Sequence, residues 1–181
     1  MTITATQLDK LTGDYVLDPA LTRIGFVAKH TIGPTVHGQF DAFEGIAHLD
    51  GDDPSASSAQ LSIRAESIQT GNPRRDPALR SKFLGAESHP VITFSSTWVE
   101  TVDQTTVRLT GDLTIRGVTK PITVDFELID VQDDPSGNVL AAFKGSARIN
   151  RKDWGVRWAA AAGMVSKHVT LEFDIAAIRQ S

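Results

Sequence analysis

Residues 122–128 read Ile-Thr-Val-Asp-Phe-Glu-Leu, so that apolar and polar side chains alternate strictly along the chain. Residues 169–175, Val-Thr-Leu-Glu-Phe-Asp-Ile, repeat the same alternation. A period of two places the apolar side chains on one face of a β-strand and the polar side chains on the other. The two stretches therefore predict two half-buried strands, each with one face turned toward a core.

Weaker alternation extends outward from these two stretches over most of the chain. It recurs at residues 24–28, 61–63, 92–98, 107–115 and 143–149, and clusters of Asp, Gly, Pro and Asn lie between the runs. Many short strands separated by turn residues predict an all-β sandwich or barrel. Gly111 and Gly145 lie inside two predicted strands, where glycine often marks a bend or a close backbone approach. This favours a closed barrel.

One segment departs from the strand pattern. Pro77 suits the first helical position, Gly85 suits the left-handed position after a helix, and Asp76 before them suits an N-cap. Leu79 and Phe83 are four residues apart and would share a helix face. The sequence predicts a short helix over residues 77–84, with an irregular loop as the alternative.

Composition excludes several classes of protein. The chain has 181 residues, which indicates one domain, and a net charge of −4, which is unlike a nucleic-acid-binding protein. It contains no cysteine, so disulfides and thiolate chemistry are excluded. No apolar run approaches the roughly 20 residues that cross a bilayer, and the N-terminus lacks a signal-peptide pattern. We therefore expect a cytoplasmic protein without a transmembrane segment.

The motifs of catalysis and cofactor binding are missing. The five histidines have no metal-ligand spacing, and the nucleophile-elbow and phosphate-loop motifs are absent. Paired aspartates lie in apparent turns, where Asp bonds to its local backbone. We expect no catalytic residue, no metal and no cofactor.

The aromatic residues are more informative. Most of the eight phenylalanines fall on predicted inward faces. An eight-stranded barrel is just wide enough to be filled by side chains or to hold one small ligand, and the residues alone leave both possibilities open. Arg151 and Arg157 lie near Trp154 and Trp158 and are candidates for a polar end of such a site.

Short motifs along almost the whole chain resemble one family. The signature Gly-Asp-Leu-Thr-Ile-Arg-Gly-Val-Thr-Lys-Pro, at residues 111–121, is closely similar to a signature of the YceI-like family. Further similar pieces occur in the same order at residues 15–18, 36–45, 67–70, 75–81, 89–94 and 149–155. The match begins at Tyr15, so we expect an N-terminal extension over residues 1–14 and a YceI-like barrel domain over residues 15–181.

The resemblance implies a lipocalin-like, eight-stranded antiparallel barrel with one or two short helices. It also implies a homodimer whose interior binds a long apolar lipid, a polyisoprenoid or an isoprenoid quinone, for sequestration, storage or transport. Family members are often periplasmic or secreted. The residues that we expect to line this site are Phe26, Phe40, Phe43, Phe83, Phe94, Leu113, Val124, Phe126, Phe143 and Trp154, with Arg151 and Arg157 at the polar end.

Such a site needs no charge or metal. Drug-sized ligands realise about 0.3 kcal/mol per heavy atom, so a lipid of some 30 to 40 carbons would reach about −9 to −12 kcal/mol. Two alternatives stay open. The first is a filled barrel that serves as an interaction or dimerisation module through Trp98 or Trp158. The second is an enzyme acting on a lipid or quinone, with His30 or His37 as the acid–base group.

Overall fold

The computed structural model describes residues 8–30, 35–133, 138–156 and 165–180. Strands dominate it, and the helical segments are all short. The strands are β1 (Gly13–Leu17), β2 (Arg23–His30), β3 (Val36–Phe40), β4 (Phe43–Leu49), β5 (Ser58–Arg64), β6 (Ile68–Gln69), β7 (Val91–Thr101), β8 (Thr106–Ile115), β9 (Val118–Asp133), β10 (Val139–Asn150) and β11 (Val165–Arg179). The helical segments are η1 (Asp9–Leu11), η2 (Pro54–Ala56), η3 (Ala65–Ser67), α1 (Asp76–Ala78), η4 (Leu79–Phe83) and η5 (Arg151–Trp154).

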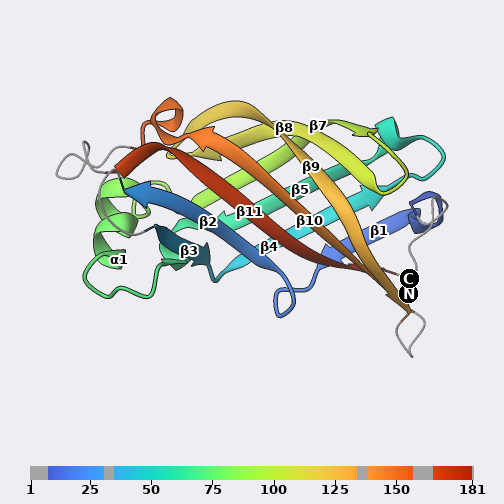
Figure 1. The fold of residues 1–181 in the computed structure, drawn as a ribbon, viewed down its shortest axis with the longest axis horizontal. Helices are drawn as coiled ribbons and strands as arrows, with labels where there is room; N and C mark the ends of the chain where they lie inside the picture. Colours follow the sequence, from blue (N-terminus) through green and yellow to red (C-terminus); the bar gives the residue numbers. More distant parts are fainter. Residues whose placement is uncertain (1–7, 31–34, 134–137, 157–164, 181) are drawn as a thin grey trace.

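The strands form one closed antiparallel barrel (Figure 1). Neighbours run in the order β1-β4-β5-β7-β8-β9-β10-β11, and β11 pairs back onto β1. β2, β3 and β6 continue β1, β4 and β5 after short interruptions, because β2 pairs with β11, β3 with β2, and β6 with β3. The pairs thus form an eight-stranded ring, which confirms the fold expected from the sequence.

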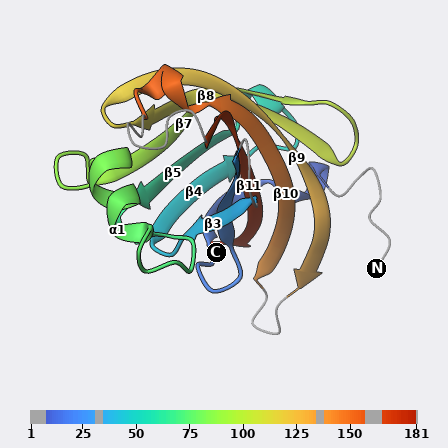
Figure 2. The same cartoon turned by 60° about the vertical axis from the view of Figure 1, so that its left-hand side comes forward.

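The alternating stretches form the long strands of this barrel. In β9, Val124 and Leu128 are buried while Thr123 and Asp125 are exposed. β11, which holds the second alternating stretch, lies beside β10 (Figure 2) and pairs with it. Along its other edge β11 pairs with β2 and β1. Because the apolar side chains of each strand share one face, closing the sheet turns all of them toward the barrel interior.

Glycines on the inner face allow neighbouring rings to approach the backbone. A Cβ on Gly111 would lie 2.5 Å from the Phe94 ring and 2.5 Å from the carbonyl oxygen of Ser95. A Cβ on Gly145 would lie 2.8 Å from the Phe126 ring. The close approach expected at Gly111 and Gly145 is therefore present, and in each case the neighbour is a phenylalanine of the adjacent strand.

A helical segment covers one end of the barrel, as expected from the sequence. Its N-terminus differs from the expectation, because Asp76 is its first residue and not its N-cap. α1 continues into η4, in which the amide of Leu84 donates to the carbonyl of Leu79. The N-cap role expected for Asp76 is wrong. Its buried carboxylate accepts the backbone N–H and the hydroxyl of Thr70 instead of a helix amide. Gly85 has φ +59°, the left-handed conformation expected after the helix.

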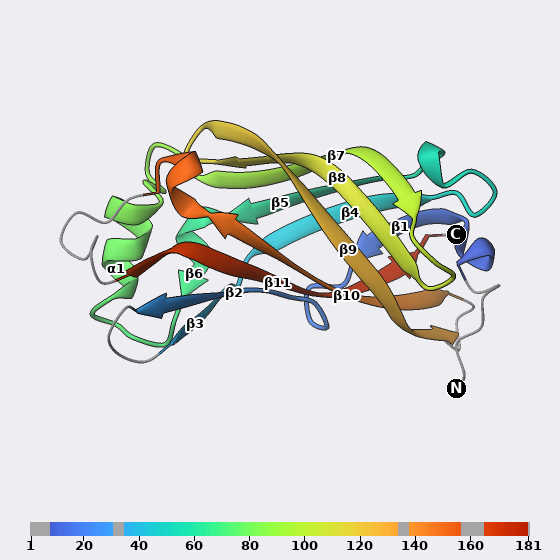
Figure 3. The ribbon, with the colours of Figure 1, turned by 45° about the horizontal axis from the view of Figure 1, so that its top comes forward.

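The two ends of the barrel are closed by different elements (Figure 3). α1 and η4 lie at one end, which we call the helical end, whereas β1 and the last residues of β11 reach the opposite end (Figures 1 and 3). There the hydroxyl of Tyr15 donates to the carbonyl of Leu11 at 2.8 Å, and both side chains are buried in a small cluster with Leu128, Ala141 and Ala177. η1 therefore packs against this opposite end.

Candidate ligand-binding cavity

The barrel contains a cavity of about 270 Å³ that is partly open to solvent. A single buried water needs only about 10–15 Å³, so the interior is hollow rather than filled by its own side chains. The lining runs from Phe83 and Arg151 at the helical end to Tyr15, Leu49 and Ala177 at the opposite end. The cavity therefore extends along the barrel.

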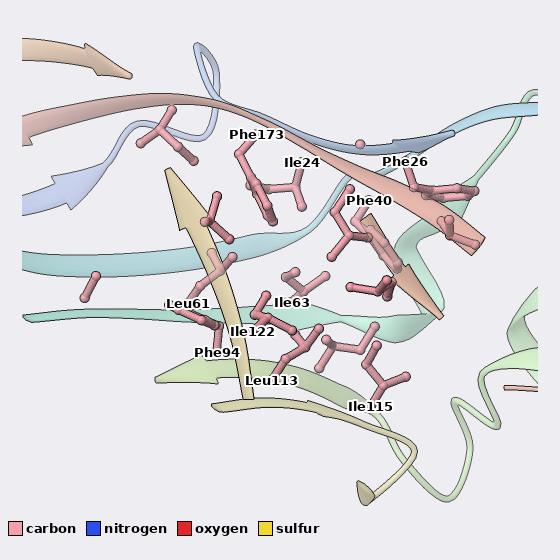
Figure 4. A pocket seen from close by; sticks show the side chains of 18 of the residues that line it. Ile24, Phe26, Phe40, Leu61, Ile63, Phe94, Leu113, Ile115, Ile122 and Phe173 are labelled. Carbon is pink, nitrogen blue, oxygen red and sulfur yellow. The ribbon is translucent and has the colours of Figure 1, made fainter. Parts of the chain in front are cut away.

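The wall is apolar on all sides. Figure 4 shows side chains from opposing strands, among them Ile24, Phe94, Leu113 and Phe173, that point toward a common space. Two pairs of phenylalanine rings lie on this wall, and the two rings of each pair contact each other. The centroids of Phe26 and Phe40 are 5.9 Å apart, and those of Phe126 and Phe173 are 5.7 Å apart, with interplanar angles of 54° and 51°. Such tilted pairs are favourable arrangements of aromatic rings.

In the described part of the lining, charged side chains lie at the helical end. Among the described lining residues, the charged side chains are Arg75 and Arg151. Arg151 is 3% exposed, and its Nε and Nη1 donate to the carbonyl oxygens of Ser166 and Val156 at 3.1 and 2.7 Å. Burial lowers the pKa of this guanidinium from its ordinary value. Its carbon atom Cζ also lies 5.6 Å from the centroid of the Phe83 ring, a cation–π contact.

The structure places most of the sequence-predicted wall residues on the cavity. The lining includes Phe26, Phe40, Phe83, Phe94, Leu113, Val124, Phe126, Phe143 and Arg151. Phe43 and Trp154 are absent from it. Phe43 packs against the core beside the cavity, and the indole of Trp154 is buried in η5, where its N–H donates to the carbonyl of Leu113 at 2.8 Å. Arg157 and Trp158 lie outside the described residues.

Further lining residues were missed by the sequence reasoning. Ile24, Ile122 and Phe173 line the cavity from β2, β9 and β11. The alternation that identified Phe26 and Val124 also places these three on the inner face, so the signal was present. Arg75 had no such signal, because it follows a loop and reaches the cavity only through the path of the chain into α1.

The remaining polar candidates lie elsewhere. His37 is exposed on β3, and the side chain of His30 is outside what the structure describes. In the described ranges no group of three or more His, Asp or Glu side chains is placed to hold a metal ion. None of the described helices has the length and apolar character that crossing a membrane requires.

Comparison with known proteins identifies the family. The model of the YceI-like domain matches residues 15–177. The chain belongs to the YceI-like family. A curated relative, the UPF0312 protein of Pseudomonas aeruginosa strain LESB58, is 37% identical over 158 residues, which cover 87% of this chain and 81% of the relative.

Solved structures share this YceI-like fold. The crystal structure of BcnA from Burkholderia cenocepacia has a TM-score of 0.79 at 23% identity and covers 88% of this chain and 98% of BcnA. A polyisoprenoid binding domain from Saccharophagus degradans, implicated in plant cell wall breakdown, has a TM-score of 0.68 at 18% identity and covers 92% of this chain and 98% of that domain. At these identities the likeness concerns the fold.

Proposed function

We propose that this barrel binds a polyisoprenoid or similar long-chain lipid in its cavity, for sequestration, storage or transport. The observation that carries the proposal is the hollow, apolar interior of about 270 Å³. Burial of a lipid chain against such a wall contributes roughly 0.8 kcal/mol per CH₂ group. The description of the Saccharophagus degradans barrel as a polyisoprenoid binding domain supports the choice of ligand.

Extraction and rebinding test this function. Protein purified from a lipid-rich host is extracted with organic solvent, and the extract is examined by mass spectrometry. Stripped protein is then titrated with a polyisoprenoid. We expect a co-purified long-chain lipid and saturable rebinding with one site per chain. A blank extract together with no uptake of added polyisoprenoid would contradict the proposal.

A pair of variants locates the binding inside the barrel. Val124 lines the cavity, whereas the adjacent Thr123 is exposed on the outer face of β9. Val124→Phe adds four side-chain carbons that extend into the cavity, and we expect it to displace about as many lipid carbons. At about 0.3 kcal/mol per atom, affinity falls about sevenfold. Thr123→Phe is the matched control and should leave affinity unchanged, provided that both variants unfold at temperatures near that of the parent.

The finer expectations belong to the same proposal. An isoprenoid quinone carries the same kind of tail and would occupy the same cavity. Competition between a polyisoprenoid and a quinone with an equal tail measures which one the site prefers. Sedimentation of the purified protein measures whether the chain forms the expected homodimer, and a purely monomeric protein would contradict that expectation.

A further inference from the structure

The cavity is closed at the end opposite the helical end. Tyr15, Leu49 and Ala177 line it there, and they pack with Leu11 and Leu128 in a buried cluster. Leu11 and Leu128 do not line the cavity, so they lie behind Tyr15 as seen from the interior. The exposed fractions of Tyr15, Leu11 and Leu128 are only 2%, 3% and 2%. These side chains therefore seal this end of the cavity from solvent.

The ring of Tyr15 lies across the sealed end. Tyr15 belongs to β1 and lines the cavity, whereas its hydroxyl donates to the carbonyl of Leu11 in η1 at 2.8 Å. The ring therefore reaches from the barrel wall to η1. A buried hydroxyl that loses its partner is costly, so this hydrogen bond holds the ring in place.

η1 is itself tied to the barrel from two further elements. Nη1 of Arg179, at the end of β11, donates to the carbonyl of Lys10 at 3.3 Å. The amide of Gly51, between β4 and η2, donates to the hydroxyl of Thr12 at 2.9 Å. With the buried side chain of Leu11, these bonds give the Tyr15 ring a fixed support on the side away from the cavity.

The length of the cavity follows from its lining residues on β11. They begin at Val169 and end at Ala177, eight residue steps apart. At about 3.3 Å per residue and a strand tilt of about 35–45°, these steps cover about 20 Å along the barrel axis. An extended chain advances about 1.1–1.2 Å per bond, so one isoprene unit covers about 5 Å. About four extended units therefore fit along the cavity before they meet Tyr15.

We propose that Tyr15, supported by η1, is the stop that sets the length of the lipid tail, and that the last carbons of the tail lie against its ring. The inference rests on the proposed function, because it assigns a specificity-determining residue to lipid binding in the same cavity. Carbons up to the stop gain contact with the apolar wall, whereas additional carbons gain none. Affinity should therefore rise with tail length and then level off.

A series of isoprenoid alcohols tests this in the parent protein. Alcohols of two to six isoprene units are titrated into stripped protein below their aggregation concentrations. Each unit adds five carbons, which correspond to about tenfold in affinity. We expect this gain for each unit up to about four, and less than about twofold for each further unit. A tenfold gain for every unit would overturn the inference while leaving the lipid-binding function intact, and binding of none would overturn both.

Tyr15→Leu moves the stop outward. The change removes about four non-hydrogen atoms and leaves a space close to that of one isoprene unit. We expect the first tail beyond the parent's limit to gain about sevenfold in affinity instead of less than twofold. Val16→Ala is the matched control, since Val16 follows Tyr15 in β1 and is exposed on the outer face. It should leave the tail limit unchanged.

Ala47→Leu moves the stop inward. Ala47 pairs with Tyr15 across β1 and β4 and lines the cavity. Leucine adds about three carbons there, and we expect the longest tail that the parent accepts to bind about fivefold more weakly, while the two-unit alcohol changes by less than about twofold.

Thermal unfolding of both variants is measured alongside. Ala47→Leu enlarges a side chain on the cavity wall and removes no hydrogen bond, so it keeps the test decisive if Tyr15→Leu does not fold. A tail limit that stays at the parent's length in either folded variant would overturn the inference.

Discussion

Phenylalanine rings on the cavity wall lie against glycines of the neighbouring strands. Phe26 lies over Gly38, Phe94 over Gly111 and Phe126 over Gly145. A side chain at any of these glycines would push the ring away from the wall and into the cavity. The residue choice at these positions therefore sets how much of the barrel interior stays open.

Replacement of Gly111 tests this packing. In Gly111→Ala, the new methyl group would lie 2.5 Å from the carbonyl oxygen of Ser95, which cannot move without displacing β7. We expect a loss of about 1–3 kcal/mol in the free energy of unfolding, measured by urea denaturation. Gly25→Ala is the control, because its methyl group would meet the flexible guanidinium of Arg23. Equal losses in the two variants would contradict the role of the ring and the backbone.

At the scale of the element, the turn between β8 and β9 anchors the segment α1–η4. Arg116 and Gly117 both have positive φ, 53° and 74°, as a two-residue type I′ hairpin turn requires. Arginine is an unusual residue at such a position. Its Nη1 donates to the carbonyls of Lys82 and Phe83 at 3.1 and 3.0 Å, so this side chain ties the turn to the end of η4.

The substitution Arg116→Gly keeps the turn but removes the side chain that bonds to Lys82 and Phe83. Glycine adopts positive φ without strain, but the two hydrogen bonds of Arg116 are lost and the unfolded chain gains entropy. These contributions oppose each other, so we expect the free energy of unfolding to change by less than about 1 kcal/mol. The segment α1–η4 loses its tie, and the amides of Leu84 and Ala86, which bond to Leu79 and Arg80, should exchange hydrogen faster. Amides of β9 serve as the internal reference. Unchanged protection of Leu84 and Ala86 would refute the anchoring role.

The strands were easier to predict from the sequence than the short helical segments that meet the barrel. Strict alternation at residues 122–128 and 169–175 identified the inner face, because burial of one face of a strand is a local pattern. The partner of Asp76 was not predictable, since an Asp before a helix has the same appearance whether it caps the helix or binds Thr70. Arg75 and Trp154 show the same limit. Whether a side chain lines the cavity or packs beside it depends on how α1 and η5 meet the barrel.

At the scale of the whole molecule, Tyr15 couples stability to pH. Burial raises the pKa of its phenol above the ordinary 10.0, and Arg179 opposes this in part. The folded protein therefore keeps the phenol proton to a higher pH than the unfolded chain does. The stability from this group is complete below about pH 10 and declines as the pH rises through the folded pKa.

Two measurements check the raised pKa of Tyr15 and its effect on stability. Tyr15 is the single tyrosine of the chain, so the ultraviolet absorbance of phenolate reports its titration alone, and we expect a midpoint above 10.0. The free energy of unfolding should decrease with pH in the same range. In Tyr15→Phe, the free energy of unfolding should fall less steeply over this pH range, because the titrating phenol is gone. At neutral pH the variant should be about 1 kcal/mol less stable, because it lacks the hydrogen bond to Leu11. A midpoint at or below 10.0 would contradict the prediction.

The pairing that closes the ring has a consequence for biosynthesis. Tyr15 lies opposite Arg179, so residues near the two ends of the sequence become neighbours. While a ribosome is still making β11, the nascent chain exposes the unpaired edges of β1, β2 and β10 together with the apolar inner face of the sheet. Contacts this distant in sequence form slowly, and exposed edges pair readily with other chains. Nascent copies on one messenger are thus most prone to mispairing in the interval before β11 pairs with β1, which is when a chaperone would help them most.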